Sequence, residues 1–379
     1  MPLVLTEDQS AMRDAARSFI AANGPITQLR QLRNANNQDG FSRDLWAKFA
    51  DQGFTGVLIP EAQGGIGLGH VEAGIIMEEI GRNLTASPFL ASAIVSATAL
   101  MQAGSAAQQS QWLPAIAAGK SIVTLAIDER TKHTPSHIEL AAKQTGNGWQ
   151  LDGNKCFVVD GHAADAFIAV ARTQAASATA QGLSLFIVPA KTAGLAIERV
   201  AMVDSRPTAR LTFKAVTLPA GALMGTLHGA APAIEATLDA GRVAAAAELL
   251  GLAESIFDRT AAYLRERKQF DRIIGSFQAL QHRAATLYTD LAITRAAVIN
   301  AQQALAAGSQ KAAAAASIAK SRAGSTATLA VQEGVQMHGG MGMTDEFDAG
   351  FYMKRARALQ ELWGDADFHA NRLARLRGY

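Results

Sequence analysis

The chain has 379 residues, a formal net charge of +2, 49% hydrophobic residues and only 18% charged residues. It is too apolar for an intrinsically disordered chain, and its near-neutral charge creates no basic field for nucleic acid. A single cysteine, Cys156, excludes an internal disulfide, and no apolar run reaches the roughly 18 residues of a membrane-spanning helix. We therefore expect a cytoplasmic, mainly helical protein with no nucleic-acid partner, no membrane span and no signal peptide.

Residues 1–120 are predicted to form a helical domain. Apolar residues recur at helical spacing around Thr6, and the acidic residues that follow Thr6 are typical of a helix N-cap. Ser42 is a second expected N-cap, and residues 60–69 form a glycine-rich loop. Further helices are expected at 71–80, 89–101 and 108–118.

Residues 121–229 have the pattern of an antiparallel β domain. Residues 122–127 are rich in β-branched side chains, and the pairs Asn147-Gly148 and Asp152-Gly153 are typical of tight turns. The small-residue stretch at 173–181 is expected to be a surface loop. Further strands are expected at 149–151, 156–159, 166–171, 183–188, 195–200 and 210–218.

Residues 230–379 are predicted to form a four-helix-bundle domain. Alanine has the highest helix propensity and lets helix axes approach closely, and alanine runs are frequent here. The fold class is therefore α+β, with domains at 1–120, 121–229 and 230–379. Helices are expected at 230–268, 277–307, 311–337, 346–361 and 366–376.

Two segments of the C-terminal domain carry a resemblance to a known family. Residues 265–282 read RERKQFDRIIGSFQALQH, and residues 335–344 read VQMHGGMGMT. Together with the loop at 60–69, they resemble the signature segments of the acyl-CoA dehydrogenase superfamily, in the same order and over essentially the whole chain. The resemblance implies FAD-dependent α,β-dehydrogenation of an acyl-CoA thioester in fatty acid or steroid side-chain catabolism. It also implies an electron-transfer flavoprotein as electron acceptor and a dimeric or tetrameric assembly.

The resemblance further implies which residues hold the ADP part of FAD. In the family, an arginine reaches across a subunit interface to the FAD pyrophosphate, and Arg267 matches it. A guanidinium is permanently charged and can fork onto two phosphate oxygens. The remaining matches to the cofactor site are Gln269, Phe270, Gln278, Gln336, Gly339 and Gly340. His338 is expected to be structural, and no metal site is expected.

The residues that would hold the flavin ring and perform the chemistry depart from the family pattern. The family's catalytic base is a glutamate at one of two positions, which are Gly241 and Trp363 here. The flavin-lining loop, expected near 125–136, lacks the family motif, and the Trp-Ile-Thr strand beside the ring becomes residues 157–159, Phe-Val-Val. A valine offers no hydroxyl to the ring. Asp271 also replaces a family glycine, and no catalytic residue is assigned.

Three interpretations follow. The chain resembles the small-subunit type of bacterial hetero-oligomeric members, so it can supply the ADP clamp to a catalytic large-subunit paralogue. Alternatively, it is a self-sufficient dehydrogenase with the base relocated to Asp365, Glu361, Asp239 or Glu248. The sequence leaves open whether the assembly is a homo-oligomer or a hetero-oligomer. The third interpretation is a non-catalytic structural or regulatory homologue.

Overall fold

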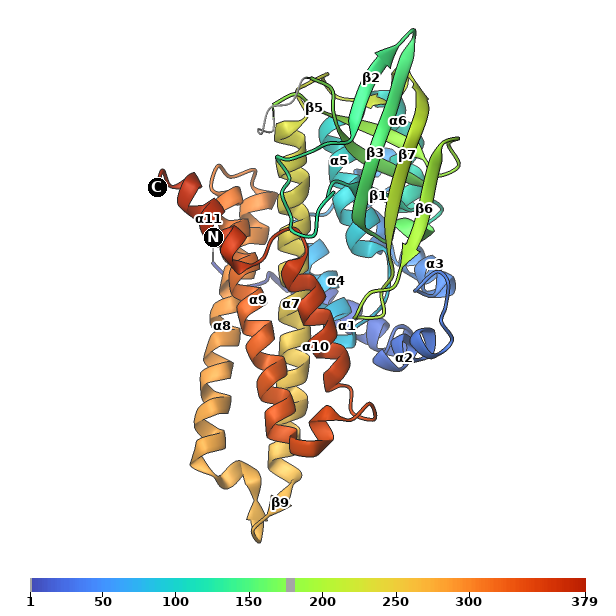
Figure 1. Ribbon diagram of the computed structural model, residues 1–379. Helices are drawn as coiled ribbons and strands as arrows, with labels where there is room; N and C mark the ends of the chain where they lie inside the picture. The colour runs from blue at the N-terminus through green and yellow to red at the C-terminus, as the bar shows by residue number, and fades with distance from the viewer. Residues whose placement is uncertain (1, 175–180) are drawn as a thin grey trace. The chain divides into compact units, whose positions relative to one another are not determined.

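A computed structural model describes residues 2–174 and 181–379, which form two compact units (Figure 1). The helical unit combines the chain up to Gln31 with His70–Thr85 and Arg242–Tyr379. The β unit combines Leu32–Gly69 with Ala86–Gly241. Most of the expected surface loop at 173–181 lies outside the described residues. The expected α+β class is confirmed, and the division into three domains stays a prediction.

The helical unit is built from long helices whose ends follow the sequence pattern closely. The helices expected at 277–307 and 311–337 match α8 and α9 to within one residue. Thr6 caps α1 as expected, because its hydroxyl accepts a hydrogen bond from the backbone N–H of Gln9 at 3.2 Å. The unit contains α1 (Glu7–Asn23), α4 (His70–Asn83), most of α7 (Ala231–Glu266), α8 (Gln278–Ala306), α9 (Ala312–His338), α10 (Ala349–Glu361) and α11 (Ala366–Leu376).

Helices α4 and α7 cross in backbone contact at two glycines. A Cβ atom at Gly81 would lie 2.1 Å from the carbonyl oxygen of Glu248, and one at Gly251 would lie 1.9 Å from that of Glu78. No larger residue fits at either position unless the helices separate. Helix α4, from the first quarter of the chain, therefore packs directly against α7, the first of the C-terminal helices.

Ion pairs reinforce the same packing. The guanidinium of Arg295 on α8 binds Glu78 of α4 at 2.7 Å and Glu254 of α7 at 2.5 Å. Glu248 on α7 is fully buried and is held by both nitrogens of the Arg355 fork on α10, at 2.7 and 2.8 Å. A buried charge is tolerated when it is paired in this way.

In the β unit, a buried π-helix positions the first strand. The helix expected at 89–101 is a π-helix at Phe89–Ser96 followed by α5 (Ala97–Ala103). The Ser96 hydroxyl donates to the carbonyl of Val123 at 2.8 Å, and the N–H of Val123 donates to the Ser92 hydroxyl at 3.2 Å. The unit also holds α3 (Arg43–Asp51), capped by Ser42 as expected, and α6 (Ala106–Ala117). Helix α2 (Ile26–Asn34), not expected from the sequence, crosses the boundary between the units along the chain.

The sheet is mixed, although the sequence pattern favoured an antiparallel one. Its order is β6-β7-β3-β2-β4-β5-β8, and β1 pairs with β4. Most pairs are antiparallel, but β1 and β2 run parallel to β4. A parallel pair needs a long connection, which the β2–β3 hairpin provides between β1 and β4. The strands are β1 (Val123–Ala126), β2 (Ala141–Thr145), β3 (Gly148–Val159), β4 (Ala166–Arg172), β5 (Leu183–Pro189), β6 (Leu195–Val200), β7 (Thr208–Pro219) and β8 (Leu223–Met224).

The predicted turn at Asp152-Gly153 is wrong. Strand β3 runs through both residues, and its register against β7 shifts there, between Leu151 and Gly153. Gly153 has φ +144°, so the glycine serves a β-bulge instead of a turn. The turn that joins β2 to β3 lies at Gly146-Asn147, one residue before the predicted Asn147-Gly148.

Candidate functional site

The two signature segments meet at one end of the helical unit. The hairpin of β9 (Lys268–Gln269) and β10 (Arg272–Ile273) lies at the lower end of Figure 1, between α7 and α8, where α9 also ends. The ring of Tyr263 on α7 stacks on that of His338 at 4.3 Å, and His338 packs against Phe347 at 4.2 Å. We call this region the hairpin end.

His338 has a structural role in this stack. Its Nδ1 lies 2.7 Å from the carbonyl oxygen of Gly334, and its side chain is buried. Burial lowers the pKa of the imidazole, so the neutral form predominates at neutral pH. This geometry agrees with the structural role expected from the sequence.

Arg267 has a fixed backbone and an open side chain. Its N–H donates to the carbonyl of Tyr263 at 2.9 Å, and its own carbonyl accepts from Ile274 at 2.8 Å. The side chain is exposed, and within residues 2–174 and 181–379 its guanidinium makes no hydrogen bond or ion pair. All its donors therefore remain available to an outside anion.

The hairpin turn places Phe270 outside the unit. Phe270 and Asp271 have φ +52° and +59°, which with the two-residue loop indicates a type I′ turn. Phe270 is 86% exposed and meets Phe277 edge-on, with ring centroids 6.3 Å apart. Asp271 replaces the family glycine at a position with a left-handed backbone, which aspartate tolerates better than most residues.

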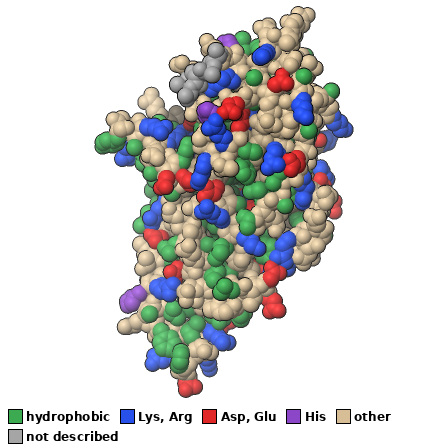
Figure 2. Space-filling view, in the orientation of Figure 1, with side chains coloured by type: hydrophobic (Ala, Val, Ile, Leu, Met, Phe, Trp, Pro, Cys, Tyr) green, Lys and Arg blue, Asp and Glu red, His purple; other side chains and the backbone are tan. Residues whose placement is uncertain are grey.

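The other expected cofactor residues at the hairpin end are also exposed. Gly339 ends α9 with φ +61°, and a Cβ atom at Gly339 or Gly340 would meet no atom within 4 Å. The side-chain amides of Gln278 and Gln336 make no hydrogen bond within the described chain. Figure 2 shows apolar and basic side chains together at this end of the molecule.

This arrangement fits the diphosphate and adenosine end of FAD. It offers a guanidinium and two amides with unused donors, beside a glycine backbone that faces open space. Backbone N–H groups without a neighbouring Cβ can approach phosphate or ribose oxygens closely. The residues that could hold this part of the cofactor are Arg267, Gln278, Gln336, Gly339 and Gly340.

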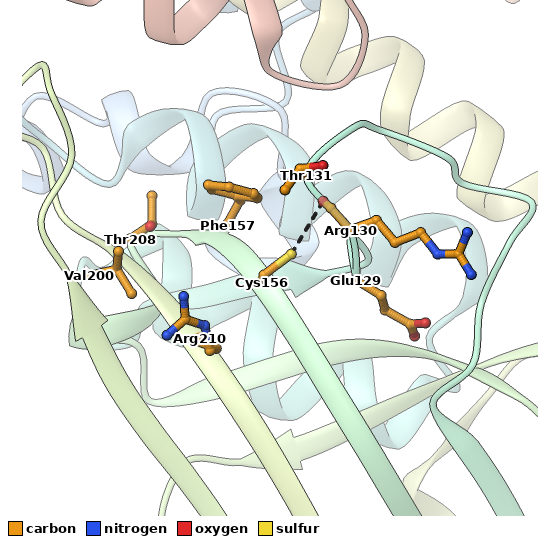
Figure 3. A pocket seen from close by; sticks show the side chains of 8 residues that line it. All are labelled: Glu129, Arg130, Thr131, Cys156, Phe157, Val200, Thr208 and Arg210. Carbon is orange, nitrogen blue, oxygen red and sulfur yellow. Dashed lines mark hydrogen bonds between the residues drawn. The ribbon is translucent and has the colours of Figure 1, made fainter.

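The β unit has a pocket of about 270 Å³ at the segment expected to pack the flavin ring (Figure 3). In Figure 3 the Glu129 carboxylate and the Arg130 guanidinium point away from Cys156. The Cys156 thiol donates to the carbonyl of Arg130 at 3.5 Å, and burial raises its pKa to about 11, so it stays protonated and unreactive. The lining residues are Glu129, Arg130, Thr131, Cys156, Phe157, Val200, Thr208 and Arg210.

The polar groups around this pocket are mostly used within the chain. The fully buried ammonium of Lys155 binds the Glu129 carboxylate at 2.7 Å and the carbonyl of Ile127 at 3.0 Å. Glu129 also accepts the backbone N–H of Leu140 at 2.9 Å. The carbonyl of Val159 is taken by the hydroxyl of Thr124 at 2.6 Å.

The side chains of residues 157–159 contain neither a hydrogen-bond donor nor an acceptor. The polar edge of a flavin ring needs both. In this chain, the segment expected to pack the flavin ring therefore does not fit that edge, in contrast to the hairpin end.

The four carboxylates considered as relocated bases all have structural partners. Glu248 is bound by Arg355, as described above. Asp365 caps α11 by accepting the N–H of Phe368 at 2.9 Å, and Glu361 pairs with Arg357 at 3.0 Å. Asp239 is 5% exposed and also has an interaction partner. A general base must turn a lone pair toward its substrate, and these contacts occupy the carboxylates elsewhere.

The loop after α10 carries Trp363, which is 4% exposed and has φ +54°. The Nε of Arg242 donates to the carbonyl of Trp363 at 3.1 Å. The ammonium of Lys320 on α9 donates to the carbonyls of Gln360 and Gly364, both at 3.1 Å. The sequence reasoning missed Lys320, although an isolated lysine on the apolar side of an alanine-rich helix was a usable signal.

Three family models match consecutive parts of the chain. They describe the N-terminal, middle and C-terminal domains of acyl-CoA dehydrogenases, over residues 6–120, 129–216 and 228–376. Separately, no helix in the described residues is long and apolar enough to cross a membrane.

Sequence and structure comparisons agree with these matches. The acyl-CoA dehydrogenase FadE12 of Mycobacterium tuberculosis is 30% identical over 357 residues, which cover 93% of this chain and 91% of FadE12. A chain in a structure of the electron transferring flavoprotein of Acidaminococcus fermentans superposes with a TM-score of 0.92 at 28% identity, with full coverage of both chains. A chain of the ChsE4-ChsE5 complex from M. tuberculosis gives 0.89 and 28%, again with full coverage of both.

Proposed function

The chain belongs to the acyl-CoA dehydrogenase family, whose general reaction is FAD-linked dehydrogenation, and on this premise we propose that it holds the ADP part of FAD for a catalytic partner subunit. The observation that carries the proposal is the exposed guanidinium of Arg267 at the hairpin end, which has no partner among the residues that the structure describes. When bound, FAD supplies the acceptor for the hydride removed from the acyl-CoA. The residues of this chain bind and orient the cofactor's diphosphate.

The state of the other site residues supports a division of labour between two different subunits. Gly241 and Trp363 stand at the base positions, and residues 157–159 offer no polar side chain to a flavin ring. A paralogous large subunit would provide the base, the ring site and the acyl-CoA site, and an electron-transfer flavoprotein would accept the electrons. The similarity to a chain of a two-protein complex, ChsE4-ChsE5, favours such an assembly.

The main alternative is a self-sufficient acyl-CoA dehydrogenase. It requires a carboxylate that is free to act as base, and Asp365, Glu361, Asp239 and Glu248 all have other partners. A non-catalytic homologue is the other alternative. It predicts a colourless protein, alone and in every complex.

The test compares the purified chain with its co-purified complex with a large-subunit paralogue encoded nearby. We expect the chain alone to retain less than one FAD per protomer and to show no flavin bleaching with acyl-CoA. The complex should be yellow and should bleach. A chain that alone holds one FAD per protomer and is reduced by acyl-CoA would overturn the proposal.

A further inference from the structure

The loop between α10 and α11 is held by basic side chains from two other helices. Arg242 of α7 binds the carbonyl of Trp363, and Lys320 of α9 binds those of Gln360 and Gly364. Both cationic side chains are essentially inaccessible, with exposed fractions of 0% for Arg242 and 1% for Lys320. The carbonyls at the end of α10 thus receive hydrogen bonds from buried side chains that water does not reach.

Helix α11 also packs against this loop, through the ring of Phe368. The Arg242 guanidinium lies 5.4 Å from the centre of the Phe368 ring, and a Cβ atom at Gly364 would lie only 2.3 Å from that ring. Gly364 has φ +116°, so it also supplies a backbone conformation that other residues rarely adopt. The loop is therefore fixed by contacts from α7, α9 and α11.

These contacts hold Trp363 in a left-handed backbone conformation, which is unfavourable for tryptophan. A left-handed backbone at a residue other than glycine costs about 1–2 kcal/mol, and Trp363 has φ +54°. The surrounding contacts must offset that cost, and the result is a tryptophan residue with only 4% of its surface exposed. Strain that is kept in this way marks a position where the side-chain direction matters.

The anchors do not depend on a permanent charge at Lys320. Burial, followed by the nearby Arg242, lowers the pKa of Lys320 to about 7. A neutral amine still has two N–H donors, which equals the number of carbonyls that Lys320 binds. Glu361 and Asp365 act on the lysine in the opposite direction, toward the charged form.

We propose that Trp363 is a plug that fills the place of the acyl end of a substrate, so that this chain's own acyl-CoA site is closed. This inference rests on the proposed function, because it explains how a subunit with the family fold leaves the substrate to its partner. In the family that the chain belongs to, the side chain at the base position reaches the acyl group, so a buried tryptophan at the matching position would occupy the space that an acyl group needs. An indole is also far larger than the carboxylate it replaces.

The test measures binding of octanoyl-CoA, butyryl-CoA and CoA to the purified full-length chain by calorimetry. The variant Trp363→Gly removes the plug, and glycine suits the backbone at φ +54°. We expect the wild-type chain to bind both thioesters no better than CoA. The variant should bind octanoyl-CoA at least about tenfold more tightly than CoA, since a buried methylene contributes about 0.8 kcal/mol.

Two further variants keep the test decisive. Trp363→Leu fills part of the space and should give an intermediate gain if the glycine variant does not fold, since losing a buried tryptophan costs about 3–5 kcal/mol. Trp149→Leu, at a tryptophan of the β unit that is 6% exposed, makes a cavity elsewhere and should give no gain.

Two outcomes would overturn the plug. One is a wild-type chain whose affinity already rises with acyl length. The other is a folded Trp363 variant that gains nothing over the Trp149 control. Neither outcome bears on how FAD divides between the chain and its partner, so the plug and the ADP clamp fail separately.

Discussion

The hairpin end and the loop around Trp363 differ in what their polar groups bind. At the hairpin end, Arg267, Gln278 and Gln336 are exposed and have no side-chain partner within the described chain. Around Trp363, the basic side chains of Arg242 and Lys320 are buried and donate hydrogen bonds to backbone carbonyls. Exposed hydrogen-bond donors without a partner are available to a ligand or another subunit. Buried donors that are bonded to the chain's own carbonyls are not, so the region around Trp363 offers no free polar group to a ligand. Four predictions test this contrast.

The largest effect on stability is expected in the β unit, where Lys155 and Glu129 are likewise a buried polar pair bonded within the chain. Glu129→Gln removes the charge that compensates the fully buried Lys155. Breaking a buried pair by removing one partner costs about 3–5 kcal/mol. We expect the free energy of unfolding, measured with urea, to fall by that amount.

The matched control is Glu198→Gln, which breaks the exposed Glu198–Arg210 pair at 3.0 Å. Exposed pairs contribute about 0–1 kcal/mol. Equal losses of unfolding free energy in the two variants would show that the buried Glu129–Lys155 pair stabilises the β unit no more than an exposed pair does.

The second effect is a pH dependence caused by Lys320. Its pKa is about 7 in the folded chain and near its ordinary 10.5 when unfolded. Between these values the unfolded chain binds a proton that the folded chain does not, so stability rises with pH. Below about pH 7 both states are protonated, and the contribution stays at its minimum.

Urea unfolding at pH 7.5 and pH 9.5 measures this slope. The wild-type chain should gain about 2–3 kcal/mol over that range relative to Lys320→Met, since one proton contributes about 1.4 kcal/mol per pH unit. The exposed Lys354→Met serves as the control and should keep the wild-type slope. A wild-type slope in Lys320→Met would mean that Lys320 is charged in the fold.

The third effect concerns the hairpin end. Arg267→Gln should leave the stability of the chain unchanged, because the guanidinium has no partner within the described residues. FAD affinity of the complex should fall about 10- to 150-fold, which corresponds to the roughly 1.5–3 kcal/mol of a hydrogen bond to a charged group. Arg265→Gln, two residues earlier and also exposed, is the matched control. Equal FAD content in the two variants would contradict the clamp.

The smallest effect is expected at the hairpin turn. Asp271→Gly restores the family residue at φ +59° and should raise the free energy of unfolding by less than about 1 kcal/mol, seen as a slightly higher thermal midpoint. FAD binding should not change, because the turn geometry stays the same. A lower midpoint would show that the Asp271 side chain contributes something that its backbone conformation does not reveal.

Local chemistry made much of the helical structure predictable from the sequence. Thr6 and Ser42 cap helices because their side chains bond to N–H groups only three residues away. The ends of α8 and α9 follow from alanine-rich periodic segments. The parallel pairing of β1 with β4 could not be predicted in this way, because it depends on residues far apart in the chain.

The candidate site shows the same division. An Asp-Gly pair, as at residues 152–153, is compatible with both a tight turn and a β-bulge. Pairing with the distant strand β7 selects the bulge. The signature segments identified Arg267 as a candidate cofactor residue, but only the folded structure shows that its guanidinium has no partner among the described residues. Lys320 is recognisable in the sequence only as an isolated lysine in an alanine-rich helix, and its hydrogen bonds to two loop carbonyls, like the burial of Arg242, arise from tertiary packing.

The glycine crossing of α4 with α7 also has a consequence for the order of folding during synthesis. Every segment of the β unit lies before residue 242, so that unit can be complete while the C-terminal helices are still being made. Helix α4 must wait, because Gly81 meets Glu248 and Gly251 meets Glu78 only after α7 has emerged. Helix α1 can pack against α4 earlier, but the face of α4 that meets α7 stays uncovered until the chain beyond residue 251 has been made, later than any strand of the sheet.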